Sequence, residues 1–385
     1  MLATSDGLGD AELRAELVRA HRDAQAAGER AVSLVLGVFL FTHRQYARAA
    51  DHLETHFDRW PADEVAALLL DAFATGSDAG CLKRGEDLVE RQCELAGPES
   101  WLWTSRLAWT RAEQGRPYEA YELAARALER NPRSGLAVHA RAHAEQETGA
   151  GPASVLFIDR WLAADPLAVQ FKHLNWHAAL QSLAAGDFAD VRRRADEVLG
   201  HEDVGMRSAT NWRLLLAGQV PARRCQVEHV RELLTAPGGT AEVFHTFNLA
   251  LALAVEAATD DLDALARWSA ADERPEFSQV LAPVVRALAH LTAGRPEPAV
   301  DLLVRLGRDV ERLGGVRVER EIVQDTLARA LADAGEPDHA AELLHHRTST
   351  RRHHVYENLL LTAVPPRARL RGGLPSGEAS WPNPS

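Results

Sequence analysis

Apolar and polar residues recur along the chain with the 3.6-residue period of amphipathic helices, in short blocks separated by turn residues. The clearest block, 101–132, reads WLWTSRLAWTRAEQGRPYEAYELAARALERNP. In it, Gly115 marks a turn between two helical stretches and Pro132 ends the second one. No segment alternates apolar and polar residues with period two. The pattern predicts an all-α chain built of helix pairs.

Similar blocks recur and predict one helical array over 30–363. A helix from Asp10 to about Ala27 lies in an N-terminal cap, 1–29, and a tail at 364–385 is rich in Pro, Gly and Ser and is expected to be disordered. The repeat blurs between 203 and 270, although helices are still expected there, and a last helix is expected near 352–363. The clear units are 30–61, 64–98, 101–132, 135–166, 169–200, 280–313 and 318–347.

Two histidine pairs lie at equivalent places in neighbouring units. His139 and His143 are four residues apart, as are His173 and His177, so each pair shares one face of a helix. The second pair follows the first by 34 residues, which is also the distance from Pro132 to the next unit-ending proline. The spacing therefore predicts two histidine pairs stacked on neighbouring helices.

A period of 34 residues with small residues at the helix contacts resembles the tetratricopeptide repeat. The resemblance implies a right-handed α-solenoid in which the first helix of each unit lines a concave groove. It places His139 and His173 at the fifth position of their units, and His143 and His177 at the ninth. Both positions face the groove in such repeats. The same register implies that Trp109, Glu113, Gln146, Glu147 and Gln181 face the groove.

More narrowly, the chain resembles the tetratricopeptide repeat protein 38 family over roughly 55–350. The resemblance rests on these elements in order: Asn131-Pro132 before the HARAH run, the HLNWH run, the Phe244–Asn248 segment, and Leu313-Gly314-Gly315 followed by Arg317, Arg320 and Glu321. The family tends to have histidines where this chain has Asn248 and Arg317. The resemblance implies a fold but no particular reaction.

Charge and cysteine content narrow the function classes. A net charge of −12 argues against general nucleic-acid binding, which needs a positive surface. Three cysteines without a CxxC pair indicate no disulfide framework and a reducing compartment. The N-terminus lacks the order of a signal peptide, and the apolar run at 31–41 is too short to span a bilayer. These features predict a cytoplasmic monomer or homodimer that does not enter membranes, and the excess of Arg over Lys is typical of a GC-rich bacterium.

Three interpretations of the histidines remain open. In the first, they are polar groove residues that hydrogen-bond to one another, to the backbone or to Asn175. In the second, they form a cluster that binds a ligand or acts as an acid and base. In the third, they are ligands of a divalent transition metal, since neutral imidazoles suit Zn, Cu, Fe or Ni. The HExxH motif is absent, because Ala140 follows His139. Glu145 and Glu147 are the nearby carboxylates that could assist, and Trp109 could supply an aromatic wall.

Two further features near the C-terminal end of the array have competing interpretations. Gly314-Gly315 precedes a helix carrying Arg317 and Arg320, which could hold an anion at its N-terminus or, if the array curls, face the histidines. The alternative is an ordinary glycine cap of the preceding helix. The runs His345-His346 and 351–354, Arg-Arg-His-His, are expected to be solvated helix faces.

Taken together, the residues predict a binding protein whose histidine-lined groove holds a peptide or small molecule without a firmly implied cofactor. The alternatives are an enzyme that uses the histidines as acid/base groups or metal ligands, and a purely structural scaffold. The residues predicted to bind the ligand are His139, His143, His173, His177, Trp109, Glu145, Asn175, Asn248, Arg317 and Arg320.

Overall fold

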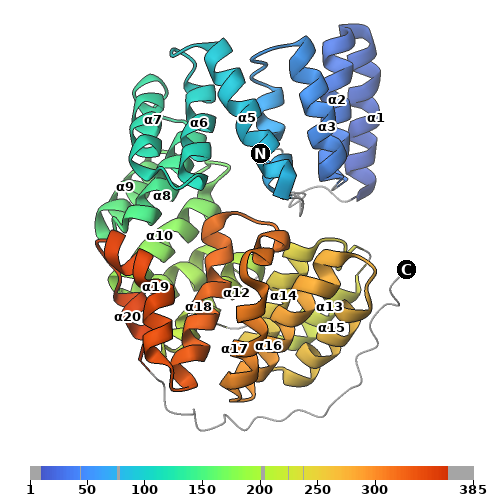
Figure 1. Ribbon diagram of the computed structural model, residues 1–385. Coiled ribbons are helices and arrows are strands. Elements are labelled where there is room, and N and C mark those ends of the chain that lie inside the picture. Colours follow the sequence, from blue (N-terminus) through green and yellow to red (C-terminus); the bar gives the residue numbers. More distant parts are fainter. Residues whose placement is uncertain are drawn as a thin grey trace. The chain divides into compact units, whose positions relative to one another are not determined.

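The structure is a computed structural model that describes residues 10–43, 45–75, 79–200, 204–223, 225–236 and 238–362. Within these ranges every regular element is a helix, which confirms the predicted all-α class (Figure 1). The tail predicted to be disordered, 364–385, lies outside the described residues. Helices pack mainly against their neighbours in the sequence, as expected of a helical-repeat array.

The chain forms two compact units, Met1–Ala144 with Gly314–Val316, and Glu145–Leu313 with Arg317–Ser385. The division falls inside α8, which begins in the first unit and ends in the second. The elements of the first unit are α1 (Asp10–Ala27), α2 (Glu29–Thr42), α3 (Tyr46–Arg59), η1 (Ala66–Leu69), α4 (Ala72–Thr75), α5 (Ala79–Ala96), α6 (Trp101–Glu113), α7 (Pro117–Arg130) and most of α8 (Gly135–Thr148). Those of the second are α9 (Pro152–Ala164), α10 (Phe171–Ala185), α11 (Phe188–Arg193), η2 (Arg194–Leu199), α12 (Val204–Leu216), α13 (Val227–Thr235), α14 (Val243–Val255), α15 (Thr259–Ala271), η3 (Glu276–Leu281), α16 (Ala282–Thr292), α17 (Pro296–Leu306), η4 (Gly307–Leu313), α18 (Arg317–Asp333), α19 (Pro337–Thr350) and α20 (Val355–Leu360).

The pair α6 and α7 shows how the sequence sets the repeat. Ser100 caps α6 by accepting a hydrogen bond from the backbone N–H of Trp103, and Pro117 opens α7 at the first turn, where a missing N–H costs nothing. Ala108 and Ala120 are fully buried where the two helices meet. Side chains this small allow the helix axes to approach closely.

The first helical stretch of the predicted unit 64–98 is broken in the structure. The residues DEVAALLLDAFATG have the apolar pattern of a single helix, but they contain η1 and the short α4 instead. Asp63 lies three residues before the start of η1, and its Oδ1 accepts hydrogen bonds from the backbone N–H groups of Val65 and Ala66. After the break, Phe73 packs closely against Gly85 of α5. A Cβ added at Gly85 would lie only 2.6 Å from Cβ of Phe73. The interruption therefore places Phe73 against the one residue type that leaves it room.

Regular helices continue through 203–270, where the repeat motif blurs. α12 packs on α14, and α14 packs on α13 and α15. Their apolar faces merge into the main core of the second unit, which includes the buried Phe247 and Leu265. The indole N–H of Trp212 donates to Thr326 Oγ1 at 2.9 Å and so ties α12 to α18. The motif weakens in this region, but helix pairing does not.

Candidate histidine site

The first histidine pair lies on α8. The Nε2 atoms of His139 and His143 are 2.9 Å apart, and the rings meet edge to face. His143 is buried, with 3% of its surface exposed, whereas His139 is half-buried. The i, i+4 spacing on a continuous helix is sufficient to bring the two rings together.

Helix α6 supplies the surroundings of this pair. Glu113 Oε1 lies 3.3 Å from Nδ1 of His143, and the Glu113 side chain is only 4% exposed. One turn earlier on α6, the half-buried Trp109 presents its ring edge to His143 at a centroid distance of 6.3 Å. A carboxylate at Nδ1 favours a proton on that nitrogen and leaves the lone pair of Nε2 directed at His139. The first unit thus contains a carboxylate–imidazole–imidazole chain.

The second pair, on α10, repeats the first. The Nε2 atoms of His173 and His177 are 3.2 Å apart, and these rings also meet edge to face. His177 is buried at 1% exposure, and His173 is half-buried. The Trp176 ring packs against both imidazoles, with centroids 5.6 Å from His173 and 5.1 Å from His177.

Trp176 also lines a small pocket in the second unit. The pocket has a volume of about 140 Å³ and is also lined by Asn248, Phe244, Phe247 and Ile322. Trp176 is 1% exposed, and its indole N–H has no acceptor within the described part of the chain. Asn248 donates to the backbone carbonyl of Phe244 in its own helix. Trp176 therefore contacts the histidine pair and also lines the pocket.

Asn175 has a structural partner. Its Oδ1 accepts a hydrogen bond from Arg194 Nη1 at 2.7 Å, and its Nδ2 donates to the carbonyl of Phe171. Arg194 is buried and also pairs with Asp159 and Asp190. Asn175 thus holds η2 against α10.

The remaining predicted residues are spread over the second unit. Arg317 pairs with Glu147 at 3.4 Å and links the first turn of α18 to the last turn of α8. Glu145 is buried on α8. Arg320 lines a separate pocket of about 710 Å³ whose walls include Val323, Leu327 and Leu343. Arg317 therefore forms an ion pair with α8, whereas Arg320 lines a pocket elsewhere in the second unit.

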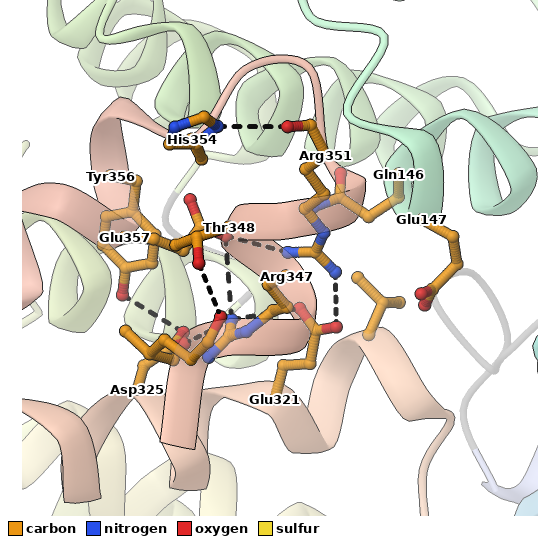
Figure 2. A network of polar contacts seen from close by, with 12 residues as sticks. Gln146, Glu147, Glu321, Asp325, Arg347, Thr348, Arg351, His354, Tyr356 and Glu357 are labelled. Carbon is orange, nitrogen blue, oxygen red and sulfur yellow. Dashed lines mark hydrogen bonds and ion pairs between the residues drawn. The ribbon is translucent and has the colours of Figure 1, made fainter. Parts of the chain in front are cut away.

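The prediction of a solvated face at Arg351 is wrong. Arg351 is 4% exposed and forms ion pairs with Glu321 at 2.6 Å and with Glu357 at 3.0 Å (Figure 2). The backbone N–H groups of Arg352 and His353 donate to carbonyls at the end of α8, which draws this segment into the fold. The exposure of the neighbouring Arg352 fits the prediction.

Arg351 belongs to a buried network with α12, α18, α19 and α20. Arg347 pairs with Asp325 at 2.7 Å, Arg213 approaches Asp325 at 3.3 Å, and the hydroxyl of Tyr356 donates to Asp325 at 3.1 Å. The cavity among these side chains measures about 10 Å³, which is room for one water molecule at most. The network is therefore a structural lock. Its sequence signal is a pair of i, i+4 spacings, Glu321 to Asp325 and Arg347 to Arg351.

Comparison with known proteins assigns no family to this chain. No protein-family model matches the chain, and no curated protein matches it significantly. The resemblance to the tetratricopeptide repeat protein 38 family therefore stays a prediction. None of the helices in the described ranges has an apolar stretch long enough to cross a membrane.

Proposed function

We propose that this chain is a helical-repeat binding protein whose histidine-bearing helices, α8 and α10, hold a small molecule or the end of a peptide. The observation that carries the proposal is the pocket beside Trp176, because it combines a buried, unpaired N–H with apolar walls and adjacent imidazoles. Ligand sites usually have this mixture of apolar lining and a few polar groups. We further infer a cytoplasmic location, because three cysteines without a CxxC pair are typical of a protein in a reducing compartment.

The pocket limits the ligand chemistry. A volume of about 140 Å³ is smaller than the several hundred Å³ of a typical drug-sized site, so it suits a group of a few heavy atoms. A carbonyl oxygen would satisfy the Trp176 N–H, and the phenylalanines would cover a short apolar stem. Glu319 also lines the pocket, so a neutral carbonyl group fits it better than a carboxylate. The ligand we propose is a small amide or a peptide carbonyl end.

Nuclear magnetic resonance of the indole N–H groups tests this proposal. The Trp176 signal is assigned as the one lost in Trp176→Phe, and the protein is titrated with acetate, propionate and acetamide. We expect acetamide to cause a saturable downfield shift of the Trp176 signal, with the signal of Trp212 as the internal control because its N–H already has Thr326 as acceptor. If acetamide does not move the Trp176 signal, the proposal is wrong.

An enzyme is the second candidate, and Glu113 is the observation that favours it. A buried carboxylate on one imidazole nitrogen, with a second imidazole at the other, is an arrangement that can take up and release a proton. Replacement of His139 would then abolish turnover of a bound substrate without abolishing its binding. A pure binding protein would instead lose affinity.

A further inference from the structure

We propose that the pairs His139–His143 and His173–His177 each chelate a divalent transition metal ion of the zinc, nickel and copper group. The inference deepens the proposed function, because it names an inorganic ligand for the same helices. Each of the four side chains can give one nitrogen to a metal. Each pair therefore offers two nitrogens to one ion.

The spacing of the nitrogens suits a chelate. Imidazole nitrogens bind zinc at about 2.0–2.1 Å, so two of them at angles of roughly 90–110° lie about 2.9–3.4 Å apart. The Nε2 atoms are separated by 2.9 Å in the first pair and by 3.2 Å in the second. Both pairs therefore already have the separation of adjacent ligands, and an ion could replace the proton that now joins the rings.

The surroundings of the first pair are those of a metal-bound histidine. Protein ligands of this kind usually donate the second ring N–H to a carboxylate, which fixes the tautomer and makes the ligating nitrogen more basic. Glu113 occupies this place at Nδ1 of His143. The carboxylate comes from α6 and the imidazoles from α8, so the arrangement is not a by-product of helical spacing alone.

The donor set also indicates which metals fit. Imidazole nitrogens prefer zinc, copper and nickel to magnesium or calcium, which prefer oxygen. The second pair is packed against the Trp176 ring, and this apolar cover keeps water from at least one side of the imidazoles. Ala140 stands where a metalloprotease would have its general base, which favours metal binding over peptide hydrolysis.

Calorimetric titration with zinc and nickel chlorides tests the inference on the full chain made without an affinity tag and stripped with a chelator. The variant His143→Ala/His177→Ala removes one nitrogen from each pair. The control His345→Ala/His346→Ala removes two exposed histidines from α19. We expect wild type and control to bind one or two ions per chain, and the first variant to bind at least about 100-fold more weakly.

A second variant guards against misfolding, because His143 and His177 are buried. His139→Gln/His173→Gln changes only the half-buried members and should weaken binding while circular dichroism stays the same. Cobalt absorption bands typical of nitrogen coordination should appear in wild type and disappear in both variants. Substoichiometric binding by wild type, or equal binding by the histidine variants, would overturn the inference. Trp176→Phe separates the two proposals, since it should abolish the indole response and leave the metal stoichiometry unchanged.

Discussion

Glu113 on α6 and His143 on α8 approach to 3.3 Å, with each side chain less than 5% exposed. This contact joins helices of two successive repeats. It also fixes which imidazole nitrogen is directed at His139. The carboxylate therefore decides which nitrogen of His143 can act as an acceptor or a ligand.

Replacing Glu113 with Gln should weaken metal binding by about 10–100-fold, the usual effect of losing a carboxylate that orients a ligating histidine. The amide keeps the size of the side chain but lacks its charge. Calorimetry with zinc measures the change. Glu122→Gln, on the exposed face of α7, is the matched control and should bind as wild type does. Unchanged affinity in Glu113→Gln would show that the carboxylate has no part in metal binding.

Replacing Arg351 with Ala should lower the free energy of unfolding of the second unit by about 3–5 kcal/mol, because it leaves the carboxylates of Glu321 and Glu357 in a buried site without this partner. Chemical denaturation followed by circular dichroism measures the loss. Arg352→Ala removes an exposed guanidinium next to it and should change stability by less than about 0.5 kcal/mol. Similar losses in the two variants would contradict the structural lock.

Stability should fall as the solution becomes acidic. Burial would raise the pKa of Glu321, but the charges of Arg351 and Arg347 outweigh it and lower the pKa from 4.5 to about 2. The unfolded chain therefore takes up the proton at a higher pH than the folded one. The contribution of Glu321 is complete above about pH 4.5 and is lost as the pH falls from there through 2.

Denaturation at a series of pH values between 6 and 2 measures this dependence. Glu321→Gln cannot ionise, so its stability should fall less steeply over the same range than that of wild type. Asp63 is a second group of this kind: burial would raise its pKa, but hydrogen bonds from Arg30 and His56 lower it to about 2. Asp63→Asn should flatten the remaining slope. Parallel pH profiles for wild type and Glu321→Gln would contradict the assigned pKa.

Gly149→Ala should destabilise the end of α8 more than an ordinary glycine substitution. Gly149 has φ of 61°, and a Cβ there would lie 2.7 Å from Cβ of Arg351. Gly294→Ala is a matched control, because its φ is 71° and a Cβ added there would have nothing within 4 Å. The control should lose about 1–2 kcal/mol for the left-handed backbone alone. Gly149→Ala should lose more, and thermal melts of both variants measure the difference.

Much of the fold follows from the sequence, because small residues, turn glycines and prolines act locally. The block at 101–132 is α6 and α7, and the spacing of His139 and His143 leads to their contact. The local pattern at 64–75 does not predict the break in the helix. The break is accompanied by the hydrogen bonds to Asp63 and by the contact of Phe73 with Gly85, which lies in another helix.

Long-range burial was harder to predict. Arg351 lies in a charged and polar run that resembles a solvated helix face, and only the cover provided by α18 and α20 makes it a core residue. The repeat register predicts that Glu113 faces the groove, but its distance from His143 depends on how α6 packs against α8. The pocket beside Trp176 could not be predicted, since its walls come from α10, α12, α14 and α18.

Native mass spectrometry after addition of zinc tests the histidine site most directly. It counts the ions bound to each intact, untagged chain. We predict one or two zinc ions on wild type and on His345→Ala/His346→Ala, and none on His143→Ala/His177→Ala at the same zinc concentration. Equal zinc loading of all three proteins, or a wild type without zinc, would contradict a metal site at His139, His143, His173 and His177.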